Sequence, residues 1–292
     1  FQKLQEKPHT LVLTTGVSYD SNVLFSPDNT DSGSATDSAS ARALLAGSYT
    51  WRAIYKRSYD LSVNLNTYYM YSVNEDVVDA DPLIYSLGVL YSYKTYIGSK
   101  AYILRLSPGY EALQLNGVAT QNSITFDIGN TLIMGPKWIS TYDLEARSDD
   151  TVTDTSTGDD DADATKIIFS TTQTYFLDDK KTKGIIGELG YTSNGAKGDN
   201  KAYTRIDLGA SYLMPITDWE ATFIGGLAVY QSTYKSDRKD TNSTLNLALS
   251  KPFSQLITGG LTANYTKNSS NEDSNTYTQY SILATATFNW IF

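Results

Sequence analysis

Apolar and polar residues alternate along almost the whole chain with the two-residue period of β-strands. The clearest case is the final stretch, residues 275–292. One face carries the apolar set Tyr280, Ile282, Ala284, Ala286, Phe288, Trp290 and Phe292. The other face carries Gln279, Ser281, Thr285, Thr287 and Asn289, with Leu283 as the one exception. A stretch this long with one continuous apolar face predicts a strand that lies against an apolar medium.

The same alternation predicts fourteen strands between His9 and Phe292, joined in turn by long polar loops and short tight turns. Long loops are expected at residues 26–40, 74–81, 116–121, 148–164, 194–200, 235–240 and 267–274, and short turns at 56–57, 97–100, 134–137, 178–181, 215–218 and 252–255. This rhythm is typical of a transmembrane, antiparallel, up-and-down β-barrel, whose outer loops are long and whose periplasmic turns are short. An even strand number then places both termini in the periplasm. We expect a periplasmic stub at residues 1–8 and the barrel at residues 9–292.

The four tryptophans give an independent indication of a bilayer. Trp51, Trp138, Trp219 and Trp290 all lie beside a predicted short turn or the C-terminus, and therefore at one end of the barrel. An indole ring prefers the boundary between lipid and water. We therefore expect these residues and Phe292 to be anchors at the membrane interface. A second aromatic girdle is expected at the other end, from Tyr19, Tyr71, Tyr110, Tyr191, Tyr230 and Tyr265.

Composition agrees with a β-rich exported protein. The chain has 23 tyrosines, 20 glycines and no cysteine, and no run approaches the length of a membrane-spanning helix. The net charge of -9 argues against a nucleic-acid partner, because phosphates require a basic face. The competing structure is a large soluble all-β sandwich or propeller. A propeller would show a repeat of about forty residues, and the sequence has none.

If the apolar face meets lipid, the other face lines a lumen. That face is mostly small and polar, and its charged members are the candidate lumen and selectivity residues: Arg42, Arg52, Asp60, Arg105, Glu111, Asp127, Asp143, Glu145, Arg147, Glu188, Arg205, Asp207 and Glu220. They could form a charged constriction that filters solutes. They could instead form a structural network that neutralises buried charge and partly plugs the lumen. Fourteen strands enclose enough space for an aqueous path, which favours conduction.

Catalytic and metal chemistry find little support in the sequence. The only histidine, His9, lies at the predicted periplasmic end, so a nucleophile-histidine mechanism is not expected. Asp159, Asp161 and Asp163 imitate the start of a calcium loop, but Ala164 and Ser170 replace its required Gly and Glu. We expect no enzyme activity, no metal and no cofactor.

Two short segments resemble known outer-membrane proteins. The aromatic ending with Phe288, Trp290 and Phe292 resembles the C-terminal signal of bacterial outer-membrane barrels, and this resemblance implies recognition by the barrel-insertion machinery. Residues 16–23 (GVSYDSNV) resemble the first barrel strand of tetratricopeptide-linked outer-membrane proteins, including the surface lipoprotein assembly modulators. That resemblance implies a fourteen-strand barrel, with residues 1–8 as the remnant of a helical periplasmic domain.

We therefore expect a passive, porin-like channel or translocation pore in the outer membrane of a Gram-negative bacterium, surrounded by lipid and lipopolysaccharide. The alternative is a non-conducting barrel that serves as a membrane anchor, as a scaffold or as a component of an export or assembly complex, with a periplasmic or surface protein as its partner.

Overall fold

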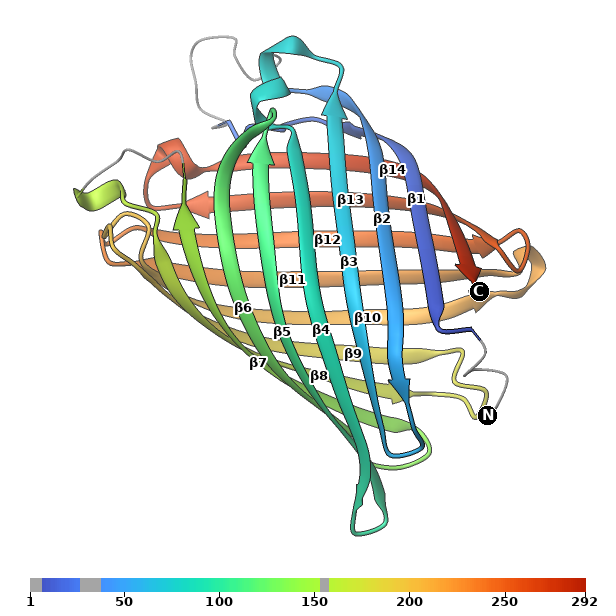
Figure 1. Ribbon diagram of the computed structural model, residues 1–292. Coiled ribbons are helices and arrows are strands. Elements are labelled where there is room, and N and C mark those ends of the chain that lie inside the picture. Colours follow the sequence, from blue (N-terminus) through green and yellow to red (C-terminus); the bar gives the residue numbers. More distant parts are fainter. Residues whose placement is uncertain (1–6, 27–37, 153–157) are drawn as a thin grey trace.

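The protein is a single closed β-barrel (Figure 1). The computed structural model describes residues 7–26, 38–152 and 158–292. Its strands are β1 (His9–Asp20), β2 (Ser40–Tyr55), β3 (Tyr59–Ser72), β4 (Pro82–Ile97), β5 (Lys100–Leu115), β6 (Val118–Ile133), β7 (Trp138–Thr151), β8 (Ala164–Phe176), β9 (Gly184–Ala196), β10 (Tyr203–Ile216), β11 (Ala221–Tyr234), β12 (Lys239–Pro252), β13 (Ile257–Ser270) and β14 (Tyr277–Ile291). Each strand pairs antiparallel with its neighbours in sequence, and β1 closes the sheet against β14. The predicted fold class and strand number are confirmed.

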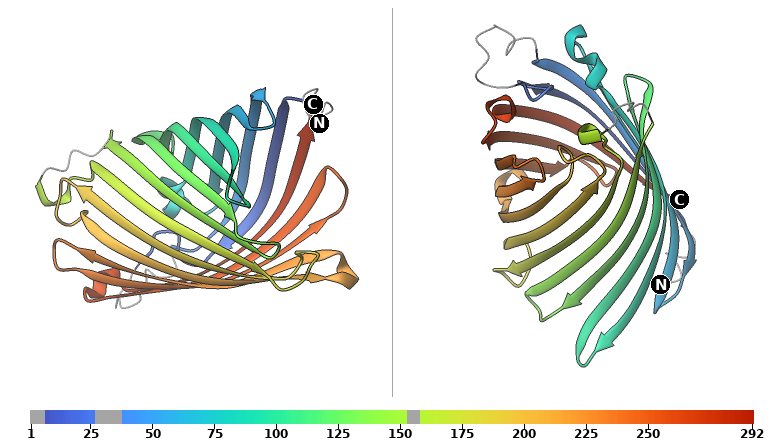
Figure 2. Two further views of the ribbon diagram at one scale, coloured as in Figure 1. Left: turned by 90° about the horizontal axis from the view of Figure 1, so that it is seen from below. Right: turned by 90° about the vertical axis from the view of Figure 1, so that its left-hand side faces the viewer.

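The seam between β1 and β14 brings the two ends of the chain together. Its register runs from Thr10 opposite Ile291 to Asp20 opposite Ser281. The backbone N–H of His9 donates to the carbonyl of Phe292 at 3.0 Å, and the N–H of Phe292 donates back to His9 at 3.0 Å. The first and last strands therefore begin and end at one rim of the barrel, here called the terminal rim, and the opposite rim is called the loop rim (Figures 1 and 2). The periplasmic location of the terminal rim stays a prediction, and most of the predicted stub, residues 1–6, lies outside the described residues.

The barrel exposes its large apolar side chains on the outside and buries small polar ones, which is the reverse of a soluble protein. Large apolar side chains point outward, as Val17, Leu45 and Ile124 do with 67%, 56% and 68% of their surface exposed. Among the described residues, the buried apolar side chains are few and mostly alanine, whereas buried serines such as Ser62 and Ser123 are common. A soluble monomer rarely exposes so much contiguous apolar surface. The outward face, here called the apolar belt, is stable only against an apolar medium.

Strand ends depart from the sequence prediction at the loop rim. The expected loop at residues 116–121 is wrong, because Asn116 and Gly117 alone connect β5 to β6. Their positive φ angles of 47° and 76° fit the two-residue hairpin turn that an Asn-Gly pair favours. Residues 148–151 and 194–196, expected in loops, continue β7 and β9. These segments are polar on both faces, so they show no alternation by which a strand could be recognised.

In the described parts of the connections, the helical elements are short 3-10 helices: η2 (Glu75–Ala80), η3 (Gly158–Asp160), η4 (Thr217–Trp219) and η5 (Asp273–Asn275). Within the three described ranges, no helix has the length and apolar character needed to span a bilayer. At the terminal rim the β4–β5 hairpin reaches beyond its neighbours, as its tip in Figure 1 shows. The predicted alternation of long and short connections thus holds only in part, since the β5–β6 turn at the loop rim is one of the shortest.

Candidate functional site

The structure places the candidate residues on the lumen side of their strands, with one exception. Their strand phase is opposite to that of the apolar belt, and three pairs of them form ion pairs on the inner wall: Arg105 with Asp143, Arg147 with Glu111, and Arg205 with Asp207. The residues placed in this way are Arg42, Arg52, Asp60, Arg105, Glu111, Asp127, Asp143, Glu145, Arg147, Glu188, Arg205 and Asp207. Their role in selectivity stays a prediction.

Glu220 is the exception. It follows η4 as its C-cap, with a φ of 51°, and it is exposed. It lies in the turn before β11, which begins at Ala221, so its assignment to the lumen wall stays a prediction. The short turn before β11 was expected at residues 215–218, but β10 continues to Ile216, so the turn lies two residues later, at 217–220.

Three adjacent strands carry the largest group of lumen charges. On β5, β6 and β7, the register places Arg105 opposite Gly129, and Gly129 opposite Asp143. Arg105 Nη2 donates to Asp143 Oδ1 at 2.9 Å across the intervening strand. A Cβ on Gly129 would come within 2.6 Å of Asp143 Oδ1 and 2.7 Å of Arg105 Nη2. The missing side chain of Gly129 is therefore what lets this ion pair form over β6.

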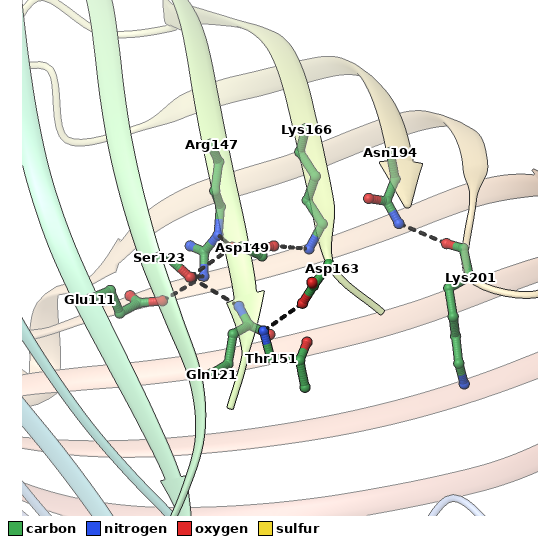
Figure 3. A network of polar contacts seen from close by, with 10 residues as sticks. All are labelled: Glu111, Gln121, Ser123, Arg147, Asp149, Thr151, Asp163, Lys166, Asn194 and Lys201. Atoms are coloured by element: carbon green, nitrogen blue, oxygen red, sulfur yellow. Dashed lines mark hydrogen bonds and ion pairs between the residues drawn. The ribbon is translucent and has the colours of Figure 1, made fainter. Parts of the chain in front are cut away.

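A second network lies nearer the loop rim (Figure 3). Arg147 donates to Glu111 Oε1 at 2.8 Å and to Asp149 Oδ1 at 2.6 Å. Asp149 also pairs with Lys166 at 2.6 Å and accepts a hydrogen bond from Ser123 at 2.6 Å. Its side chain is only 1% exposed, so its charge is stabilised by these partners and hardly by water. Four strands, β5 to β8, are held together at this point.

Sequence reasoning missed Asp149 and Lys166. Asp149 was assigned to the acidic loop at residues 148–164, although it continues the odd-numbered lumen series of Asp143, Glu145 and Arg147. Lys166 has the inward phase of β8, opposite Arg147. The continuing parity of β7 could have identified Asp149, and the parity of β8 could have identified Lys166.

Asp127 and Glu145 lie between these two networks. They are directly opposite each other on β6 and β7. Among the described residues, neither carboxylate has an ion-pair or hydrogen-bond partner. Both line a cavity of about 510 Å³ on the inner wall, together with Asn64, Ser86, Gly88, Arg105, Ser107, Gly109, Glu111, Thr125 and Arg147.

Smaller charged groups lie elsewhere on the inner wall. Arg42 pairs with Asp81 at 3.3 Å, and Lys94 pairs with Asp60 at 2.5 Å. The Arg52 guanidinium lies 5.0 Å from the ring centre of Tyr55. Each of these three basic groups thus has a partner close to it in the structure.

The β9–β11 region holds a further group. Arg205 pairs with Asp207 at 3.0 Å, and its guanidinium lies 5.0 Å from the ring centre of Tyr230. Tyr230 is opposite Asp207 in the register, so it faces the lumen, and its prediction as an outer-girdle residue is wrong. Successive residues of β11 face opposite sides of the wall, so Tyr230 faces inward because the adjacent Val229 faces outward. Glu188 lies opposite Gly209, where its Oε2 occupies space that a side chain would fill.

The predicted interface anchors lie together at the terminal rim. Trp51 is opposite His9, Trp290 is opposite Leu11, Trp138 begins β7, and Trp219 lies in η4. Phe292 stacks on the His9 ring with centroids 5.5 Å apart. Their contact with lipid headgroups stays a prediction, as does recognition of Phe288, Trp290 and Phe292 by the insertion machinery.

One ion pair outside the barrel wall yields a prediction on pH. Lys197 contacts Asp163 at 2.7 Å, and this hydrogen bond, with a second from the backbone N–H of Thr151, lowers the pKa of Asp163 from the ordinary value of an aspartate. A carboxyl whose pKa is lowered by folding contributes stability above its unfolded pKa and loses it as the pH falls through the folded value. We expect the chemical shift of the Thr151 amide to titrate in NMR spectra with a midpoint below that of an ordinary aspartate. Lys197→Met should raise that midpoint, and an unchanged midpoint would contradict the assignment.

Comparison with solved structures identifies proteins of similar fold. No protein-family model and no curated protein matches this sequence. Among solved structures, the outer-membrane porin OprB of Pseudomonas putida matches with a TM-score of 0.55 at 8% identity, over 99% of this chain and 96% of that chain. A bacterial polysaccharide outer membrane secretin matches with a TM-score of 0.50 at 9% identity, over 97% of this chain and 99% of that chain. This chain therefore has the closed, antiparallel, up-and-down barrel fold found in outer-membrane porins.

Proposed function

We propose that this chain is a passive channel in the bacterial outer membrane. The apolar belt supports the membrane location, because it fits a bilayer and would be unstable in water. The tryptophans gathered at the terminal rim support it further, since indole rings favour the headgroup boundary. The likeness to the OprB barrel is consistent with both points.

The observation that carries the channel proposal is the inner wall. It consists of small and polar side chains, and its glycines and serines leave a cavity of about 510 Å³ beside the charged strands. A lumen lined in this way holds water, and charged groups on its wall act on passing ions. The function requires no catalytic residue and no cofactor.

Conductance of the refolded full chain in a planar lipid bilayer tests the proposal. We expect discrete, stable current steps from protein that shifts in electrophoretic mobility on heating, which marks a folded barrel. Silence from such folded protein would contradict the proposal. It would instead favour the non-conducting barrel, in which the ion pairs of the inner wall are purely structural.

A pair of neighbouring substitutions tests whether the current passes through the lumen. Gly88 lines the cavity and Val89 faces outward from the same strand. We expect Gly88→Trp to lower the unit conductance, on the order of half, because an indole fills part of a lumen of this size. Val89→Trp should leave it unchanged. Equal effects of the two substitutions would show that current bypasses the barrel.

A further inference from the structure

Two neighbouring carboxylates on the inner wall form no ion pair with any described residue. Asp127 and Glu145 are a directly paired cross-strand couple on β6 and β7. Their flanking residues in the same row are Ser107 on β5 and Ile168 on β8, and neither carries charge. Within the described parts of the chain, no base lies within ion-pair distance of either carboxylate.

The nearby bases are already held by other acids. In the row toward the terminal rim, Arg105 is paired with Asp143 at 2.9 Å. In the rows toward the loop rim, Arg147 is paired with Glu111 and Asp149, and Lys166 is paired with Asp149 as well. The two flanking groups are each close to neutral, so the row between them carries the uncompensated negative charge.

A structural role alone does not account for this arrangement. Like charges directly opposite each other on adjacent strands destabilise a sheet. An amide at either position would fit the same wall at lower cost. Both carboxylates also line the 510 Å³ cavity, where their charge acts on whatever enters it. The pair is therefore placed to act on a solute rather than on the fold.

We propose that the pore is selective for cations and that Asp127 and Glu145 set this selectivity. This inference rests on the proposed channel function. A low-dielectric wall focuses the field of its fixed charges into the water that it encloses, so cations concentrate beside the pair and anions are repelled. The solute class is accordingly one that carries positive charge, from simple metal ions to ammonium and guanidinium groups.

The test is the reversal potential of the full-length, refolded protein in a potassium chloride gradient. The measurement is best made near 0.1 M salt, where the screening length is about 10 Å. We expect the wild-type channel to prefer potassium to chloride by roughly tenfold, as charge-lined clefts do. The double variant Asp127→Asn with Glu145→Gln should bring the permeability ratio close to unity. It should also fold, because it removes a repulsion and no hydrogen-bonded pair.

Two control variants test whether the change in selectivity comes from Asp127 and Glu145. Asp179→Asn with Glu272→Gln removes the same two charges from exposed connections and should leave the ratio unchanged. Glu188→Gln removes a lumen charge that does not line the cavity, and its effect should be clearly smaller than that of the double variant. An equal effect would overturn the assignment to the pair, as would a double variant with the wild-type ratio.

The outcomes separate this inference from the channel function. A folded barrel that conducts no current refutes the channel and the selectivity together. A barrel that conducts but prefers chloride, or shows no preference, refutes the selectivity and leaves the channel standing.

Discussion

Replacing Asp149 by asparagine is expected to lower the free energy of unfolding by about 3 kcal/mol, the loss typical when one partner of a buried ion pair is removed. The Asp149 side chain is 1% exposed and pairs with both Arg147 and Lys166. The variant leaves Lys166 without its counter-ion and leaves Arg147 with only Glu111. Urea unfolding in lipid vesicles, followed by tryptophan fluorescence, gives the measurement.

Asp179→Asn is the matched control. Asp179 also forms an ion pair, with Lys137 at 2.9 Å, but its side chain is 94% exposed. Exposed pairs contribute about 0 to 1 kcal/mol, so this variant should unfold close to the wild type. Equal losses in the two variants would show that the burial of Asp149 has no energetic consequence.

Replacing Gly16 by alanine is the second change with a large expected effect. Its added Cβ would lie 2.6 Å from the carbonyl oxygen of Ala284 and 3.0 Å from Thr285 Cγ2, both on β14. The obstacle is backbone, so the seam has to shift. We expect a loss of about 2 kcal/mol, within the range for overpacked sites. The same urea unfolding measures it.

Gly88→Ala is the control for this change. Gly88 also faces the lumen from mid-strand, but a Cβ there would approach only the carbonyl oxygen of Pro108, at an ordinary 3.6 Å. This variant should be neutral or slightly stabilised, because alanine loses less backbone entropy than glycine on folding. If Gly88→Ala cost as much as Gly16→Ala, the effect would reflect glycine in strands and not the seam.

Sequence patterning predicted the fold because a barrel repeats one simple rule. Each strand presents alternate residues to lipid and to the lumen, so parity alone indicates which face a residue such as Leu45 or Arg105 occupies. The number of strands and the common rim of the four tryptophans followed from the same rule. Beyond the apolar belt the rule no longer applies, because both faces meet water. The start of β6 and the ends of β7 and β9 were therefore misjudged.

The charged wall could be predicted only as a list of residues. Which acid pairs with which base depends on the register between strands, and that register is set by turn lengths and by the ladder of backbone hydrogen bonds. The sequence shows Arg105, Asp127 and Asp143 on successive strands. It does not show that Gly129 lets Arg105 reach Asp143, nor that Asp127 faces Glu145. Which charged side chains form ion pairs, and which do not, is decided by the register of the closed sheet.

The seam between β1 and β14 has a consequence for biogenesis. A strand with unpaired N–H and C=O groups is a template for aggregation, and a closed barrel has no such edge. Here the edge of β1 is covered only by residues 277–291, near the far end of the chain. Until they arrive, β1 and β13 both remain open to wrong partners. Any copy that lacks these residues therefore presents two unpaired strand edges, and a copy with the closed seam presents none.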